Sequence, residues 1–75
     1  MHRSTPSYKR TISALGKQIR KLRQARGWTL EQAAEAMSMD ATQLAKIEAG
    51  ALNVTLVTLV RIADGLQVKV GMLFT

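Results

Sequence analysis

The sequence predicts an all-α fold, a compact bundle of four to five short helices, and three observations lead to this class. Apolar residues recur at steps of three and four along most of the chain, which is the period of an amphipathic helix. Thr or Asp precedes several of these apolar runs and Gly follows them, as helix caps do. At 75 residues the chain is one small domain, which buries only about 60–65% of its unfolded surface.

An apolar stripe predicts that the first helix begins at Ile12, and we expect Gly27 to end it in a left-handed conformation. The stripe consists of Ile12, Leu15, Ile19 and Leu22. Residues 1–11 have no apolar period, contain the only proline and include Arg3, which indicates a flexible basic arm. The predicted organisation is therefore an arm over residues 1–11 and a folded domain over residues 12–75.

Capping residues predict three further helices. Thr29 and Gln32 have the spacing of a capping box, and Asp40 and Gln43 repeat it eleven residues later. Thr55 is a third N-cap candidate. The predicted spans are Leu30–Met37, Ala41–Ala49 and Leu56–Asp64.

The end of the chain fits two structures. We expect Gly65 to close the preceding helix, with Leu66 folding back onto it. In residues 67–75 the apolar side chains alternate like those of a strand, yet Val70, Leu73 and Phe74 also fit a single helical turn. A short fifth helix is the preferred interpretation, and the strand remains the alternative.

Positive charge is concentrated at one end of the chain. Eleven Lys and Arg side chains against five Asp and Glu give a formal net charge of +6. Residues 1–26 hold eight of the basic side chains and no acidic one, whereas residues 27–75 hold three basic and five acidic ones. This asymmetry favours a polyanionic partner such as nucleic acid or an acidic membrane surface; the alternative is a basic helix that is merely solvated.

The composition argues against several function classes. There is no cysteine, so we expect no disulfide and no thiolate metal site, which fits a reducing, cytoplasmic compartment. The single histidine, His2, stands near the terminus, where nothing would hold its ring for catalysis or metal binding. No hydrophobic run exceeds three residues, against about 18–20 for a membrane span. We therefore expect no enzyme, no metal, no cofactor and no membrane partner.

The second and third predicted helices have the spacing of a helix-turn-helix, a motif whose second helix enters the major groove of DNA. With Leu30 as the first position, the close crossing of the two helices requires a small residue at the fifth, which is Ala34. The alternative is a generic helical bundle with a short turn. The apolar residues that the motif requires are all present: Ala33, Met37, Met39, Leu44 and Ile47.

Residues 15–74 resemble the phage-repressor and Cro type of helix-turn-helix domain, the XRE family, which has a lambda-repressor-like fold. The segments LGKQIRKLRQARGWTLEQAAEAM, MDATQLAKIEAG and NVTLVTLVRIADGL carry the resemblance. The chain length and the Leu-Phe near its end are similar to small controller proteins of restriction–modification systems, and antitoxin-type regulators share the domain. The resemblance implies a buried ion pair between Arg23 and Glu48, which would tie the first helix to the third; the alternative is that both are solvent-exposed.

The sequence departs from the family pattern at three places. Leu30 replaces the common Gln at the start of the second helix, and Ala51, Leu52 and Asn53 replace a usually basic loop. Two phosphate-contacting side chains are thereby missing. Ser38 replaces a frequent turn glycine, which costs up to about 1 kcal/mol if the position is left-handed.

The outward face of the third helix is the predicted DNA-reading surface. At 100° per residue its outward side chains are small or weakly polar, so we expect DNA shape and half-site spacing to carry much of the specificity. Lys46 can donate to guanine and Thr42 to a base edge or phosphate, while the alanines can meet thymine methyl groups. The expected DNA contacts, including neutral and arm contacts to phosphate, are Lys9, Arg10, Thr29, Ala41, Thr42, Gln43, Ala45, Lys46 and Asn53.

The fourth helix is more apolar than one core face needs. Five apolar residues, from Leu56 to Leu66, suffice for packing, and the excess predicts a homodimer with recognition helices about 34 Å apart. The alternatives are that the excess covers a monomer core or meets a missing domain. The expected interface consists of Val57, Val60, Val70, Leu73 and Phe74.

Two function hypotheses follow. The first is a homodimeric, sequence-specific transcriptional regulator that binds double-stranded DNA at a (pseudo)palindromic operator. The second is an antitoxin or protein-interaction module with reduced DNA contacts, whose partner would be a protein such as a toxin or polymerase. No residue identifies the operator, the regulated gene, an effector or the sign of regulation.

Overall fold

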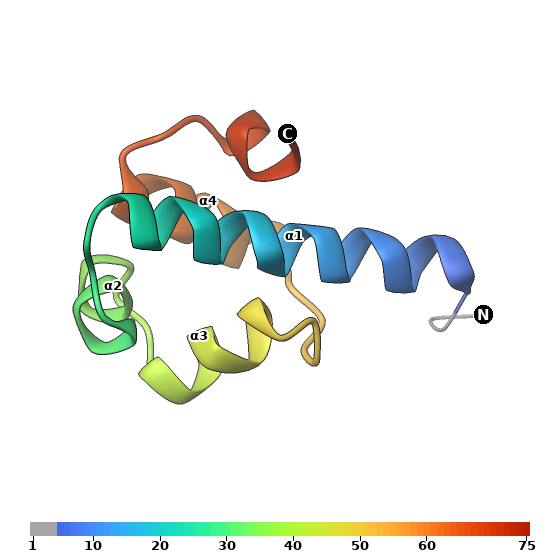
Figure 1. The fold of residues 1–75 in the computed structure, drawn as a ribbon, viewed down its shortest axis with the longest axis horizontal. Coiled ribbons are helices and arrows are strands. Elements are labelled where there is room, and N and C mark those ends of the chain that lie inside the picture. The colour runs from blue at the N-terminus through green and yellow to red at the C-terminus, as the bar shows by residue number, and fades with distance from the viewer. Residues whose placement is uncertain (1–4) are drawn as a thin grey trace.

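The computed structural model describes residues 5–75 and consists of four α-helices and one 3₁₀ helix (Figure 1). No strand occurs within these residues, and the all-α prediction is confirmed. α1 follows the long axis of a molecule of 35 × 23 × 20 Å, with α2 and α3 below it in Figure 1 and η1 above it. The elements are α1 (Pro6–Ala25), α2 (Leu30–Ala36), α3 (Ala41–Glu48), α4 (Leu56–Leu66) and η1 (Val70–Phe74).

One hydrophobic core joins all five elements. α1 packs against α3 on one side and η1 on the other, α2 packs against α3 and α4, and η1 also contacts α4. The apolar residues that the helix-turn-helix spacing requires lie in this core, with Met39 packed at its edge. The buried side chains are those of Ile12, Leu15, Ile19, Ala33, Ala34, Met37, Leu44, Ile47, Ile62, Ala63, Leu66 and Leu73.

α1 begins earlier than its apolar stripe predicts. The hydroxyl of Thr5 accepts a hydrogen bond from the amide of Tyr8 at 3.1 Å, and Pro6 occupies the first helical turn, where its fixed φ is favourable. Tyr8 lies one turn before Ile12 and packs against the core. The arm expected over residues 1–11 is therefore wrong for residues 6–11, which are helical, and residues 1–4 lie outside the described part of the chain.

α4 ends later than predicted, because Gly65 is inside the helix. A Cβ atom at Gly65 would lie 2.6 Å from Cγ of Met37 and 2.9 Å from the carbonyl oxygen of Ala36. The glycine is thus required where α4 crosses the end of α2. The left-handed residue that ends α4 is Gln67, with φ of 59°, and Leu66 is a buried part of the helix.

The caps of the two motif helices differ. Thr29 and Gln32 form the predicted capping box, with both reciprocal hydrogen bonds present. Asp40 is the N-cap of α3, but its side chain caps no amide, so the capping box predicted with Gln43 is wrong. α2 ends one residue before the predicted Met37, and α3 ends one residue before Ala49; both of these residues are C-caps.

The chain ends in the helical turn that was the preferred interpretation, in the form of the 3₁₀ helix η1. Leu73 is 0% exposed and fills the core between α1 and α4, so its expected place in a dimer interface is wrong. Leu56 is the opposite case, because its side chain was expected in the core and is 70% exposed. The helical period predicted burial correctly further along α4, at Ile62, but not in its first turn.

α1 and α3 approach more closely than side chains normally allow. A Cβ atom on Gly16 would lie 2.5 Å from the carbonyl oxygens of both Ile47 and Glu48. Gly50, with φ of 71°, continues this contact, because a Cβ atom on it would lie 3.2 Å from the Cα atom of Ser13. The end of α3 is therefore held directly on the backbone of α1.

Candidate nucleic-acid interface

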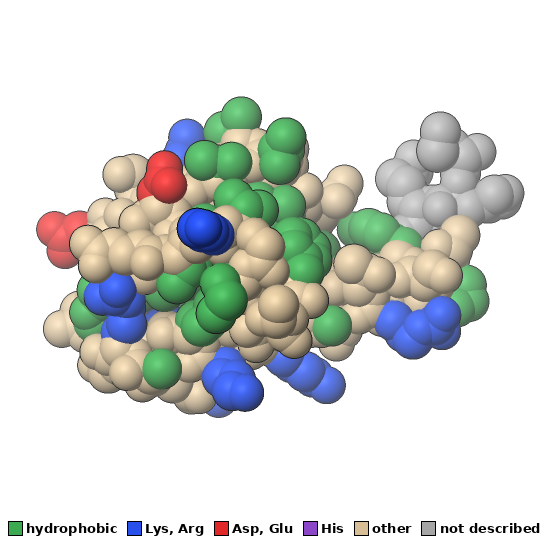
Figure 2. Space-filling view, turned by 90° about the horizontal axis from the view of Figure 1, so that it is seen from above, with side chains coloured by type: hydrophobic (Ala, Val, Ile, Leu, Met, Phe, Trp, Pro, Cys, Tyr) green, Lys and Arg blue, Asp and Glu red, His purple; other side chains and the backbone are tan. Residues whose placement is uncertain are grey.

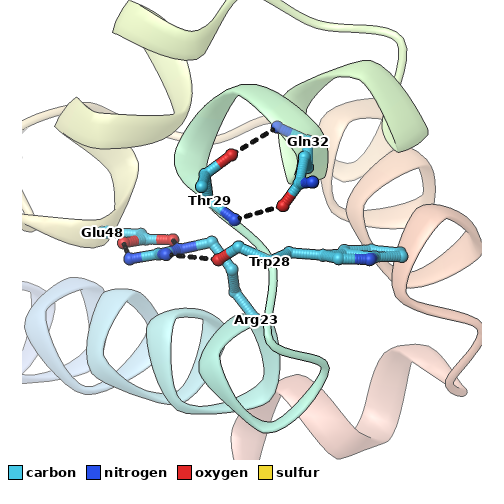
Figure 3. A network of polar contacts seen from close by, with 5 residues as sticks. All are labelled: Arg23, Trp28, Thr29, Gln32 and Glu48. Carbon is cyan, nitrogen blue, oxygen red and sulfur yellow. Dashed lines mark hydrogen bonds and ion pairs between the residues drawn. The ribbon is translucent and has the colours of Figure 1, made fainter.

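A nearly buried ion pair ties α1 to the end of α3 (Figure 3). Nε of Arg23 lies 2.7 Å from Oε2 of Glu48, and Nη2 donates to Oε1 at 3.0 Å. The two side chains are 11% and 7% exposed. The hydrogen bond to Glu48 raises the pKa of Arg23 above its ordinary value, while burial acts in the opposite direction. The structure thus brings together the pair that the family resemblance implied.

The same guanidinium also fixes the start of α2. Nη1 of Arg23 donates to the carbonyl oxygen of Trp28 at 2.9 Å, directly before the capping box (Figure 3). The Thr29 amide donates to Oε1 of Gln32 at 2.8 Å, and the Gln32 amide donates to the Thr29 hydroxyl at 3.1 Å. Arg23 therefore orients both helices of the motif, and the hydroxyl oxygen of Thr29 already accepts a bond within the protein.

Arg26 makes a second set of contacts, which the sequence reasoning missed. Its Nε donates to the carbonyl oxygen of Leu66 at 3.0 Å, and Nη2 donates to Oε1 of Gln67 at 3.1 Å. Its guanidinium carbon lies 5.0 Å from the centre of the Trp28 ring, which is a cation–π distance. The available sequence signal was only an arginine at the end of an amphipathic helix. Arg26 joins the end of α1 to the end of α4.

The outward face of α3 carries few hydrogen-bonding groups. Leu44 and Ile47 face the core, and Thr42 and Lys46 are exposed, as the helical period predicts. The remaining expected contacts on this helix, Ala41, Gln43 and Ala45, are half-buried. Thr42 and Lys46 are thus the polar side chains that α3 presents most fully to solvent.

Lys9 and Arg10 lie on different faces of α1, because neighbouring helical residues are about 100° apart. Lys9 is one turn before Ser13, whose backbone touches Gly50, so it lies on the side of α3 and the loop that follows. Arg10 lines a hollow between α1 and η1. Asn53 is exposed in the α3–α4 loop. Lys9 therefore lies on the α3 side of α1, and Arg10 lies beside the hollow next to η1.

The turn between α2 and α3 contains a left-handed serine. Ser38 has φ of 56°, a conformation that glycine adopts without strain. The amide of Met39 donates to the carbonyl oxygen of Ala34 at 2.9 Å, which closes the turn after α2. Ser38 thus occupies a left-handed position, as expected if the turn glycine of the family pattern stands there.

The five residues expected at a dimer interface lie in different environments. Val57 and Val60 are 66% and 40% exposed on α4, next to Leu56, which is 70% exposed. Phe74 is 54% exposed but lines the hollow beside α1. Val70 is half-buried against the core and Leu73 is buried. Only the α4 residues form one exposed apolar helix face.

Comparison with known proteins establishes the family. A family model described as a helix-turn-helix domain matches residues 14–73. The chain belongs to this helix-turn-helix family. Its fold is that of DNA-binding transcriptional regulators of the XRE type, and neither the family nor the fold is one of enzymes. No curated protein matches the sequence.

Two solved structures are similar to this helix-turn-helix domain. The restriction-modification controller protein C.AhdI from Aeromonas hydrophila is 30% identical with a TM-score of 0.82, and the match covers 84% of this chain and 96% of C.AhdI. An HTH_3 family transcriptional regulator from Vibrio cholerae is also 30% identical, with a TM-score of 0.85. That match covers 88% of this chain and 37% of the regulator.

Within residues 5–75 no three His, Asp or Glu side chains gather as metal ligands would. None of the helices in that range is both long and apolar enough to cross a membrane.

Proposed function

We propose that the protein is a cytoplasmic, homodimeric transcriptional regulator that binds double-stranded DNA at a (pseudo)palindromic operator. The observation that carries this proposal is the rigid presentation of α3. Arg23 holds both the end of α3, through Glu48, and the start of α2, through Trp28. A recognition helix must hold its position to within a fraction of a hydrogen-bond length, and such contacts supply that precision.

Base reading is assigned mainly to Lys46, with Thr42 beside it. Lys46 is exposed on α3 and can donate to O6 or N7 of guanine. Ala41 and Ala45 offer methyl groups to thymine, and Gln43 lies at the margin of the face. With so few donors, sequence-dependent DNA shape supplies much of the specificity.

Phosphate contacts are assigned to the α3 side of the molecule. Lys9 and Asn53 flank α3 there, and the hydroxyl of Thr29 can donate its proton to a phosphate while it caps α2. Arg10 was expected to act with Lys9, and it can do so only by reaching around α1. Contacts of this kind raise affinity for every DNA sequence and make it dependent on salt.

A second copy is the proposed occupant of the exposed apolar face of α4. Leu56 and Val57 are largely exposed and Val60 is 40% exposed on one short helix, which is costly for a small monomer. A two-fold axis through this face would place two α3 helices about 34 Å apart, one turn of DNA. The dimer would also add the burial that a chain of this length lacks.

Binding selection from a random 30-base-pair duplex pool tests the DNA function. At near-physiological salt we expect enrichment of a palindrome with half-sites about 10 base pairs apart. Lys46→Ala should weaken the selected site by about 1–3 kcal/mol and leave random DNA unchanged. Lys69→Ala, which removes an exposed lysine before η1, is the matched control. No enriched motif, or equal losses on both kinds of DNA, would count against base reading by Lys46.

Sedimentation tests the dimer separately. Val60→Glu should yield monomers, because it places a charge at the centre of the proposed interface, while Gln24→Glu on the exposed face of α1 should not. An unchanged dimer with Val60→Glu would place the interface elsewhere.

A protein-interaction role is the second candidate. The observation that favours it is the alanine-rich outer face of α3, since Ala41, Ala45 and Ala49 offer no hydrogen-bonding side chain. An antitoxin would use this face, or its surroundings, to hold a toxin. Failure of the DNA selection combined with a stable dimer would favour this candidate.

A further inference from the structure

A groove of about 540 Å³ lies between α1 and η1. Its size falls within the range of ligand and peptide sites in proteins. The floor is apolar, and the half-exposed ring of Phe74 forms one wall. Figure 2 views the molecule from the side that carries η1, and on this face hydrophobic side chains are bordered by Lys and Arg side chains. The residues that carry the argument are Ala14, Leu73 and Phe74 on the apolar part and Arg10, Lys17 and Lys21 on the rim.

The three rim cations form one stripe on α1. At 100° per residue, Arg10, Lys17 and Lys21 fall within about 40° of one another. All three are exposed, and no acidic side chain lines the groove. Within residues 5–75 the side-chain ion pair is Arg23–Glu48, so no Asp or Glu side chain there pairs with the stripe. An apolar floor beside an uncompensated positive rim is chemically complementary to an acidic amphipathic ligand.

The stripe faces away from the DNA-reading surface. Gly16 and Arg23 mark the side of α1 that touches α3. Lys17 and Lys21 are about 100–140° around the helix from Gly16. DNA held by α3 would therefore approach α1 from a different side.

We propose that the α1–η1 groove binds an acidic amphipathic helix of a partner protein. The apolar side chains of that helix would lie against Ala14, Leu73 and Phe74, and its carboxylates would face the basic stripe. This is the helix-in-groove mode of peptide recognition, with charge setting orientation and partner choice. The proposal does not depend on DNA binding by α3.

The length of the stripe supports an extended occupant. Arg10 and Lys21 are eleven residues apart, which is about 16 Å along the axis of α1 or three helical turns. A single small anion would satisfy one of the three cations. A partner helix with Glu or Asp on successive turns can face all three.

A second copy of the chain is a poorer occupant of this groove. A two-fold contact through the groove would bring the basic stripes of two α1 helices together, and like charges repel. The exposed face of α4, with Val57 and Val60, has no such conflict. DNA is also a poorer occupant, because a phosphate backbone does not use an apolar floor.

The test uses the full chain and a designed probe. The probe is an 18-residue fluorescein-labelled peptide, capped at both ends, with Leu on one helical stripe, Glu on both flanks and no basic residue. The comparison peptide has the same composition in a scrambled order that destroys the stripe. In fluorescence anisotropy at 150 mM salt, we expect the amphipathic peptide to bind at least about tenfold more tightly than the scrambled one. Equal binding of the two peptides would overturn the proposal, because only charge attraction would remain.

Charge-matched variants locate the binding site. Lys17→Glu combined with Lys21→Glu should weaken binding of the amphipathic peptide by at least about tenfold. Arg20→Glu combined with Arg61→Glu changes the net charge equally at exposed positions outside the groove, and it should change affinity by less than about threefold. Equal losses in the two double variants would overturn the proposal.

Phe74→Ser removes the ring that forms the apolar wall and should weaken binding of the amphipathic peptide. Circular dichroism shows whether each variant is folded. Amide NMR shifts of the unmodified chain give a second reading, since the peptide should shift Gln18 and Phe74 more than Thr42 and Lys46. The largest shifts on α3 would overturn the proposal.

DNA or a second copy of the chain in the groove would each give a different result. If the Lys17 and Lys21 double variant loses DNA affinity as strongly as peptide affinity, the stripe is a DNA contact and the proposal is wrong. If the same variant or Phe74→Ser changes the sedimenting mass, the groove holds a second copy and the proposal is equally wrong. Unchanged DNA affinity and mass, with lost peptide binding, supports the acidic partner.

Discussion

The helix-turn-helix half of the molecule and the α4–η1 half are stabilised in different ways. α1, α2 and α3 meet through specific polar contacts and backbone approaches, with Arg23 bonded to Glu48 and Gly16 pressed against the end of α3. α4 and η1 are held mainly by buried apolar side chains such as Ile62 and Leu73. Within residues 5–75, only the second half leaves large apolar side chains exposed: Leu56, Val57, Val60, Met72 and Phe74.

The two kinds of contact have different consequences for the structure. Directional hydrogen bonds and close backbone contacts fix an angle between helices, which apolar burial alone does not. In the first half these contacts therefore fix the orientation of α3 relative to α1 and α2. The other half supplies non-directional burial within the chain and leaves apolar side chains exposed, where we propose that partners bind.

The largest expected effect comes from breaking the ion pair. Glu48→Ala leaves the guanidinium of Arg23 buried without its carboxylate, and the free energy of unfolding should fall by about 3–5 kcal/mol. Urea unfolding followed by circular dichroism measures this loss. Glu35→Ala removes an exposed carboxylate from α2 and should change stability by less than about 0.5 kcal/mol. Similar losses in the two variants would show that the pair contributes no special rigidity.

The close contact of α1 and α3 gives the next largest effect. Gly16→Ala places a Cβ atom against the backbone of Ile47 and Glu48, so the helices must move apart at a cost of about 1–3 kcal/mol. Gly71→Ala in η1 is the matched control, since its Cβ atom would meet nothing within 4 Å. Thermal unfolding of both variants checks the contrast. A Gly16→Ala variant as stable as the Gly71→Ala variant would mean that α1 and α3 can separate freely.

Arg26 connects the two halves and should have an intermediate effect. Arg26→Ala removes two hydrogen bonds to the end of α4 and the contact with Trp28, which should lower stability by about 1 kcal/mol. Hydrogen exchange should show faster opening at the end of α4 than in α3. Arg20→Ala, from the exposed face of α1, is the control. Uniformly faster exchange in both halves would contradict a local role for Arg26.

Ser38 and Gln67, the two left-handed residues other than glycine within residues 5–75, predict the smallest effects, one in each half. Ser38→Gly should raise stability by up to about 1 kcal/mol, because φ of 56° is strained for serine. Gln67→Gly relieves similar strain at φ of 59° but also removes the acceptor for Arg26, so its gain should be smaller. Chemical denaturation of the two variants side by side makes the comparison. A larger gain at Gln67 would show that its side-chain hydrogen bond contributes little.

Local sequence signals predicted the helices well. The capping box of Thr29 and Gln32, the cap at Thr55 and the left-handed Gly27 all act within a few residues. Their effects can therefore be predicted without the tertiary structure. The early start of α1 had such a signal too, because Thr5 and Pro6 stand at N-cap and N1 and Tyr8 extends the apolar stripe by one turn.

The missed features depend on contacts between distant residues. Gly65 resembles a helix terminator, and only the crossing with Met37 shows that it is a packing glycine within α4. Leu73 and Phe74 are neighbours with opposite environments, since the 3₁₀ turn buries one and exposes the other. Of the expected DNA contacts, the helical period indicated the outward direction of Lys46. It did not separate Lys9 from Arg10, because residues 1–11 were not expected to be helical.

Because α1 begins early, its first turn offers a rigid position for a probe that can test the proposed dimer. Ser7 is exposed in the first turn of the same continuous helix whose Ile19 is buried in the core. Because the chain has no cysteine, Ser7→Cys creates a unique attachment point for a spin label. The helix would carry the label as a fixed extension of the body, so a label-to-label distance would report the rotation between two bound domains on a duplex. The protein's orientation could thereby be followed without altering any side chain of α3.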